Sequence, residues 1–330
     1  MPELPEVESA RAVIARAAVD RRIVDVDDSD TFVCRPHAPG EIRAALVGRT
    51  LTTVHRRGKS MWCDTSDDGP VLGIHLGMSG KIVVAGADGT ELDGGDYWER
   101  GRAAGDYRYT RFSLSFADGG ALLLVDPRRL GRVRLDPPVD ELGPDAADIT
   151  RAQFRAAFGS GTAPVKARLL DQNAIAGIGN LLADQALWLA KISPRRPVRD
   201  LTRNDLNRLY RAVLASVGAA VSAGGVHTLS IIPYRRPGGL CPATASPWSP
   251  RRWAAAPPGG APANRPDPVP FGSTDGTHPP AARRGGRPPC GSADRSDNGP
   301  GSPGRARHRA QRTAPPAACR SAAGCPAAVL

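Results

Sequence analysis

The stretch LLDQNAIAGIGN, residues 169–180, lies between two segments with helical periodicity. We expect helices over residues 166–172 and 181–190, joined by the glycine-containing segment 173–180. Gly177 and Gly179 allow the backbone to approach another group closely. A helix that begins at Asn180 would present backbone amides that attract phosphate. The Gly-x-Gly-Asn fragment is a weak motif by itself. Whether it indicates binding of the DNA backbone depends on the other motifs in the chain.

The patterns on either side of this stretch predict the fold class. Further helices are expected at 6–18, at 151–158 after the N-cap Thr150, and at 204–223 after the N-cap Thr202. Between residues 24 and 135, clusters of Gly, Asp and Ser separate short apolar runs, as in a β-sandwich or barrel. These runs are 51–54, 71–76, 82–85, 112–116 and 121–125. The predicted fold is α+β: an N-terminal β-sandwich with flanking helices, then a helical domain. Residues 87–104 are expected to form a long loop.

The composition changes after Pro237. The remaining residues are mostly Pro, Gly, Ala, Ser and Arg, which cannot bury enough apolar surface to offset the ordering entropy, so a disordered tail is predicted. We therefore divide the chain into a catalytic β-sandwich domain at 1–135, a helical DNA-binding domain at 136–236, and the tail at 237–330.

Charge and composition limit the class of partner. The 330 residues carry a formal net charge of +11, which favours a polyanion such as nucleic acid. A basic protein from a GC-rich genome would show the same excess. No apolar run approaches the roughly 20 residues of a membrane span, and the acidic N-terminus does not resemble a signal peptide, so we expect a cytoplasmic protein without a membrane partner. The six cysteines show no Cys-x-x-Cys spacing; we expect unpaired thiols and no metal site.

The N-terminal residues MPELPEVE, 1–8, contain the groups for amine catalysis. Removal of Met1 would leave Pro2 with a secondary amine, and an α-amino group has a pKa near 8. A neutral amine of this kind can attack an electrophilic carbon and form an iminium. Glu3 and Glu6 lie beside it for proton transfer. An ordinary helix N-terminus, where Pro and Glu are common, is the alternative interpretation.

Five motifs together are similar to the formamidopyrimidine-DNA glycosylase/endonuclease VIII family. They are MPELPEVE at 1–8, HRRGK at 55–59, HLGMSG at 75–80, DPRRLG at 126–131 and the stretch 169–180, which resembles the family's helix–two-turn–helix. Their order matches the family over about residues 1–236. The resemblance implies a monomeric base-excision repair enzyme whose partner is damaged double-stranded DNA.

The resemblance also implies roles for residues of the catalytic site. Pro2 would be the nucleophile, Glu3 the acid that assists opening of the deoxyribose ring, and Glu6 a support for the helix and the site. Lys59 would contact a phosphate near the lesion. With Arg56 and Arg57 it forms the expected basic tip of a hairpin, for which a solvated turn is the alternative.

A second group of residues would hold the distorted duplex. An enzyme that acts on a base within a duplex must flip the nucleotide out. Met78, Arg128 and Leu130 match the residues that the family inserts into the gap, and Asn180 would bind the DNA backbone. Without the resemblance, Met78 and Leu130 would be interpreted as core residues of strands.

The implied activity is that of a bifunctional DNA glycosylase and abasic-site lyase acting on oxidised bases. A Schiff base on Pro2 would undergo β- and then δ-elimination, and this chemistry requires no cofactor. Two alternatives remain: a damaged-DNA binding protein without catalysis, and a basic protein whose partner is RNA. Borohydride trapping on abasic DNA separates the first alternative from an enzyme, and competition by RNA tests the second.

The sequence departs from the family at several positions. Leu130 replaces a commoner aromatic wedge, Asn173 a common lysine and Gln185 a common glutamate. The segment 225–238 is too short for the long lesion-covering loop of members specific for 8-oxoguanine. These differences leave the preferred lesion open.

The C-terminus departs most. The family usually ends in a zinc finger with four cysteines, whereas only Cys241 lies near the expected start, so the zinc ligand set is absent. One choice of synonymous codons for residues 253–264, read from the third base, gives GGRTTWWCTRE, which resembles the finger hairpin. We therefore hypothesise a frameshift near Pro242, which sequencing of the locus would test.

Overall fold

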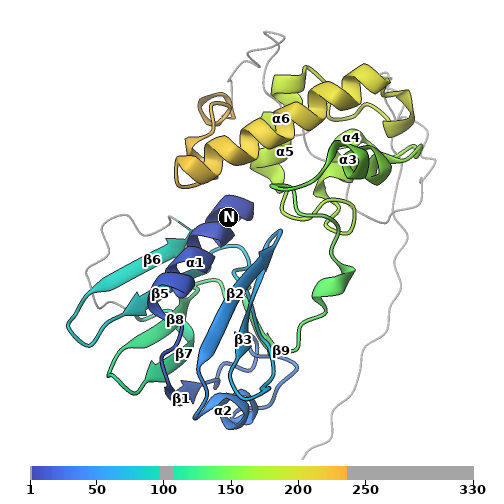
Figure 1. Cartoon of the computed structure of the whole chain (residues 1–330). Coiled ribbons are helices and arrows are strands. Elements are labelled where there is room, and N and C mark those ends of the chain that lie inside the picture. The colour runs from blue at the N-terminus through green and yellow to red at the C-terminus, as the bar shows by residue number, and fades with distance from the viewer. Residues whose placement is uncertain (1, 97–106, 236–330) are drawn as a thin grey trace, which may run out of the picture. The chain divides into compact units, whose positions relative to one another are not determined.

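The computed structural model describes residues 2–96 and 107–235 (Figure 1). The expected tail at 237–330 and the hypothetical frameshift lie outside the described residues. The domain boundary after residue 135 stays a prediction. No helix in the described part of the chain is long and apolar enough to cross a membrane, and the cytoplasmic location also stays a prediction.

Two antiparallel sheets form the N-terminal part of the described chain. The first has the strand order β1-β7-β8-β5-β6, and the second has the order β2-β3-β4-β9. The strands of the first sheet are β1 (Ile23–Asp27), β5 (Lys81–Ala85), β6 (Glu91–Gly95), β7 (Thr110–Phe116) and β8 (Ala121–Val125). Those of the second are β2 (Leu51–Arg57), β3 (Ser60–Thr65), β4 (Leu72–His75) and β9 (Arg132–Leu135). Alternate residues of β3 are buried, as expected for a strand with one face on a core. The predicted β-sandwich is confirmed.

Strand β6 corrects the expected loop at 87–104. The strand ELDGG has little apolar character, so its sequence resembles a loop. It forms because β5 pairs with it over its whole length and because α1 (Leu4–Ala17) packs on it. A Cβ atom on Gly94 would lie 2.6 Å from the Ser9 backbone. Gly94 therefore lowers the apolar character by which a strand is predicted, and its missing side chain allows α1 to pack closely on β6.

The second part of the described chain is helical. Its helices are α3 (Arg151–Phe158), α4 (Val165–Leu170), α5 (Asn180–Ala190) and α6 (Arg203–Ser222). The predicted caps Thr150 and Thr202 both close capping boxes. A further short helix, α2 (Glu41–Leu46), lies in the sandwich part, and 3₁₀ turns occupy Val139–Glu141, Val198–Asp200, Val226–Thr228 and Ile232–Tyr234. The predicted helical domain is confirmed.

Helix α1 contributes to both hydrophobic cores. Leu4 packs in the helical core with residues such as Ile178 and Leu182. Val7 and Ile14, further along the same helix, pack in the core of the sandwich. The backbone N–H of Leu4 also donates to the Gly177 carbonyl at 3.2 Å. The first residues of the chain are thus fixed against the turn that precedes α5.

Candidate active site

The buried carboxylate of Glu3 caps the start of α5. It accepts hydrogen bonds from the backbone amides of Gly179, Leu181 and Leu182 at 2.9, 2.8 and 3.1 Å. Burial raises the pKa of Glu3, while the nearby Lys59 ammonium and these amides oppose the rise. A Cβ atom on Gly179 would lie 2.3 Å from the Glu3 carboxyl carbon, so a glycine is required there.

This contact changes the expectation for the start of α5. Three of the backbone amides that could attract a phosphate are bound to Glu3 instead. The side chain of Asn180 is exposed beside them. Its contact with the DNA backbone stays a prediction that depends on the side chain.

Glu6 joins the first helix to a distant segment. One carboxylate oxygen accepts from the Glu3 backbone N–H at 3.0 Å, and the other accepts from the Val226 N–H at 2.7 Å. Burial raises the pKa of Glu6 to about 7, although these hydrogen bonds oppose the rise. Glu6 therefore ties the buried start of the chain to Val226. Its expected role as a support for the catalytic site stays a prediction.

Lys59 lies near the Glu3 carboxylate, and His75 lies near Lys59. Burial lowers the pKa of Lys59, and the charge of Glu3 opposes this shift. Burial, followed by the charges of Lys59 and Arg134, lowers the pKa of His75. The Nδ1 atom of His75 lies 3.0 Å from the Gly77 N–H, which leaves Nε2 as the donor of a neutral ring. His75 was missed as a site residue by the sequence analysis, although it begins the HLGMSG motif.

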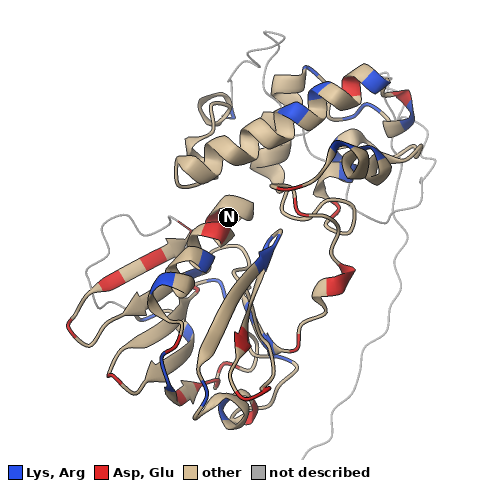
Figure 2. Ribbon diagram, in the orientation of Figure 1, with Lys and Arg blue, Asp and Glu red and all other residues tan. Residues whose placement is uncertain are grey.

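Arg56 does not face DNA as the sequence analysis expected. Its guanidinium is mostly buried and pairs with Glu8 at 2.8 Å and Asp145 at 2.5 Å. These bonds fix β2 to α1 and to the start of the helical part. The Arg57 side chain donates to the Val139 carbonyl at 3.3 Å, and its role in DNA binding stays a prediction. Figure 2 shows basic residues at the end of β2 and acidic residues at the start of α1.

The three residues expected to enter the duplex lie on two neighbouring loops. Met78 and Leu130 expose 37% and 38% of their surface, so they are not core residues of strands. Arg128 is exposed as well. The loops are in backbone contact, because a Cβ atom on Gly77 would lie 2.4 Å from the Leu130 carbonyl carbon.

Buried Asp126 holds the two loops together. Its Oδ1 accepts from the Ser79 hydroxyl at 2.5 Å and from the Arg128 N–H at 3.1 Å. Its Oδ2 accepts from the Gly131 N–H at 2.7 Å. A single carboxylate therefore sets the positions of both loops, and through them the positions of Met78, Arg128 and Leu130.

The arrangement can support amine and acid–base chemistry. No cluster of three or more His, Cys, Asp or Glu residues within 2–96 and 107–235 could hold a metal ion. The expected zinc region around Cys241 lies outside the described residues. Cys34 and Cys63 are buried and unbonded.

Comparisons with known proteins agree with this geometry. Residues 1–133 match the formamidopyrimidine-DNA glycosylase N-terminal domain, and residues 142–230 match the formamidopyrimidine-DNA glycosylase H2TH domain. The formamidopyrimidine-DNA glycosylase of Parafrankia sp. is 34% identical over 244 residues, which cover 68% of this chain and 79% of the relative. That of Salinispora tropica is 36% identical over 237 residues, covering 68% and 77%.

The chain belongs to the formamidopyrimidine-DNA glycosylase family. Solved structures of family members agree with the fold. The Lactococcus lactis enzyme, bound non-covalently to DNA containing an AP site, matches with a TM-score of 0.61 at 26% identity, covering 74% of this chain and 92% of the other. An inhibited LlFpg with DNA containing N7-benzyl-Fapy-dG matches with a TM-score of 0.60 at 26% identity, covering 73% and 90%. The formamidopyrimidine-DNA glycosylases are DNA repair enzymes that act on damaged DNA.

Proposed function

We propose that this member is a bifunctional DNA glycosylase and abasic-site lyase, with Pro2 as its nucleophile once Met1 is removed. The observation that carries the proposal is the contact between Glu3 and the start of α5. It fixes a carboxyl group beside Pro2 in a buried site, where burial raises the pKa of that group. A carboxyl group with a raised pKa can hold a proton and act as an acid.

The proposed reaction uses the nitrogen of Pro2 as an electron donor and then as an electron sink. The amine attacks C1′ of the flipped nucleotide and the C1′–N bond to the base breaks. The base departs with the bonding electrons and takes up the proton that the amine nitrogen loses. Glu3 supplies a proton to the deoxyribose ring oxygen as the ring opens, which gives an iminium between Pro2 and C1′. Loss of a C2′ proton and departure of the 3′ phosphate follow as β-elimination. A second, δ-elimination releases the 5′ phosphate.

Lys59, Arg57 and Asn180 are proposed to bind phosphates, and Met78, Arg128 and Leu130 to occupy the gap left by the flipped nucleotide. The exposure of Met78 and Leu130 on adjoining loops supports this assignment. An apolar side chain in the gap offsets part of the unstacking cost, while a guanidinium can bond to the orphan base.

Borohydride trapping of the full chain on abasic duplex DNA tests the nucleophile. Mass spectrometry of the trapped complex is expected to place the adduct on Pro2, and Pro2→Gly should reduce trapping strongly because a primary amine replaces the rigid secondary amine. Pro5→Ala, a change at another buried proline of the same helix start, is the matched control and should still trap. An adduct on a lysine would contradict the assignment. Absence of any adduct with the unaltered chain would favour a binding protein without catalysis.

A further inference from the structure

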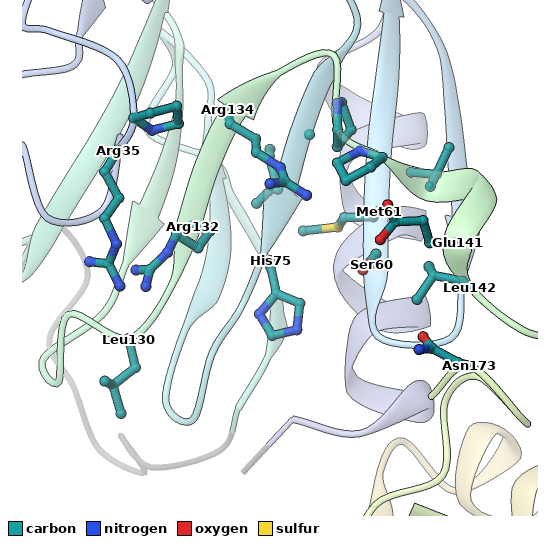
Figure 3. Close-up of a pocket in the computed structure, with 16 residues that line it drawn as sticks. Arg35, Ser60, Met61, His75, Leu130, Arg132, Arg134, Glu141, Leu142 and Asn173 are labelled. Carbon is teal, nitrogen blue, oxygen red and sulfur yellow. The ribbon is translucent and has the colours of Figure 1, made fainter. Parts of the chain in front are cut away.

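A pocket of about 720 Å³ lies on the outer face of the second sheet, between β9, the segment 137–142 and Asn173. Val133 of β9 is buried in the core, so its neighbours Arg132 and Arg134 project to the opposite face of the strand. Figure 3 shows Arg35 and Arg132 side by side, with Arg134 and His75 next to them. Leu130 lines the same pocket.

Phe32 holds two of these arginines in place. Its carbonyl accepts hydrogen bonds from Nη1 of Arg35 at 2.7 Å and Nη1 of Arg132 at 3.2 Å. Their guanidinium carbons also lie 3.9 and 5.3 Å from the centre of the Phe32 ring, which is 44% exposed. An arginine stacked on an aromatic ring loses less conformational freedom when it binds an anion, and keeps N–H groups for it.

The positive charge in the pocket is largely uncompensated. In the described part of the chain, Arg35, Arg132 and Arg134 form no ion pair with a carboxylate, whereas the neighbouring Arg129 pairs with Asp30 at 2.8 Å. Among the lining residues Glu141 carries the opposing negative charge. The Ser60 hydroxyl, the Asn173 amide and the Nε2 donor of His75 add uncharged hydrogen-bonding groups.

We propose that this pocket binds the phosphodiester backbone of the substrate DNA, at phosphates beyond the two that flank the flipped nucleotide. Leu130, proposed above to occupy the gap in the duplex, also lines this pocket, so a strand that leaves the gap could continue along the arginines. Three guanidinium groups from two segments suit successive phosphates better than a single compact anion. The proposal rests on the proposed function and adds three arginines, Arg35, Arg132 and Arg134, that lie outside the five family motifs.

A methylphosphonate scan tests the proposal. Single phosphates of a duplex that carries a tetrahydrofuran abasic analogue are replaced one at a time by the uncharged methylphosphonate, and affinity is measured for the unaltered chain and for Arg134→Gln and Arg132→Gln. Loss of one charged contact is expected to cost about tenfold in affinity and about 0.9 in the log–log salt slope. At the phosphate bound by Arg134, the methylphosphonate should lower the DNA affinity of the unaltered chain. It should not change the DNA affinity of the Arg134→Gln protein, which has already lost that contact.

Two other variants calibrate the scan. Lys59→Gln should abolish the effect of a methylphosphonate that flanks the abasic analogue. That position should differ from the positions identified with the arginine variants. Arg16→Gln, at an exposed position in the last turn of α1, should couple to none. The melting temperatures of the arginine variants must lie within a few degrees of that of the unaltered chain. Two variants are used so that the test remains possible if one of them does not fold.

The proposal would be overturned if every methylphosphonate weakened binding of the Arg132→Gln and Arg134→Gln proteins as much as binding of the unaltered chain. Arginine-dependent binding of inorganic phosphate or a mononucleotide, without an effect on DNA affinity, would also overturn it and assign the pocket to a small anion. The scan measures binding to an analogue that cannot be cleaved. Failure of borohydride trapping with intact coupling would therefore count against the proposed chemistry only.

Discussion

At the scale of the residue, Glu6 links protonation to folding. Its folded-state pKa is raised from 4.5 to about 7 by burial, so the folded chain retains a proton that the unfolded chain releases. This contribution to stability is complete below the unfolded pKa and is lost as pH rises through about 7. We expect Glu6 to reduce the free energy of unfolding by roughly 3 kcal/mol between about pH 5 and pH 8.

Urea unfolding at a series of pH values measures this effect. In the Glu6→Gln chain the free energy of unfolding should fall less over that range. Any loss of hydrogen bonding in this variant should lower the free energy by the same amount at every pH. Asp118→Asn is the control: the pKa of the exposed Asp118 is lowered to about 2, mainly by its bond with Arg21, so this carboxylate stays ionised throughout the range and its partner does not titrate. Equal slopes for the unaltered and Glu6→Gln chains would show that Glu6 does not carry the proton.

At the scale of the element, the two loops held by Asp126 should act together. Asp126→Asn keeps the size of the side chain but replaces one acceptor oxygen with a donor, so the bond to Arg128 N–H or Gly131 N–H is lost. A displacement of about 1 Å can reduce a rate about 100-fold. Base excision from a duplex should fall by roughly 10- to 100-fold, while cleavage of an abasic site in single-stranded DNA, which requires no wedge, should fall less.

Rates on the two substrates, measured in parallel, test this prediction. Asp136→Asn is the matched control, because Asp136 also accepts from a backbone amide, that of Val71, but belongs to neither loop. Asp136→Asn should leave the ratio of the two rates unchanged. A parallel loss on both substrates for Asp126→Asn would show that Asp126 supports the whole sandwich rather than the loops.

Elements with an apolar pattern of their own were predicted well, and those that depend on distant partners were not. The helix 151–158 and the strand 121–125 were predicted with the bounds that the structure shows. Strand β6 could not be predicted, because its support comes from β5 and α1. The burial of Arg56 was missed for the same reason: its partners lie 48 and 89 residues away in the sequence. The motifs gave the positions of Pro2, Glu3 and Met78, whereas contacts such as Glu3 with α5 required the fold.

At the scale of the whole molecule, a buried ion pair is expected to support the helical part. Lys166 on α4 and Asp184 on α5 are almost fully buried and lie 2.7 Å apart, and Arg235 also reaches Asp184 at 3.2 Å. Burial raises the pKa of Asp184, and Lys166 opposes the rise. Lys166→Met leaves a buried carboxylate without its main partner and should destabilise the chain by about 3–5 kcal/mol.

Denaturant unfolding of a double-mutant cycle measures the pair. Lys166→Met with Asp184→Leu should be much less destabilised than Lys166→Met alone, because no unpaired charge remains between α4 and α5. The exposed pair of Arg43 with Asp25 is the control, and its removal should cost less than about 1 kcal/mol. A small effect of Lys166→Met would indicate that Asp184 takes up a proton or pairs with Arg235 instead.

The contacts of Glu3 and Glu6 also determine when the site can exist during synthesis. Glu3 is bound by the amides of Gly179, Leu181 and Leu182, and Glu6 is bound by that of Val226. The ribosome must therefore release residue 226 before the first six residues have their final partners. Until then, the nascent chain carries the proposed amine without an aligned carboxyl group and without the loops and helices that grip DNA. The proposed reactivity toward a sugar would thus be delayed until most of the polypeptide has been translated and folded.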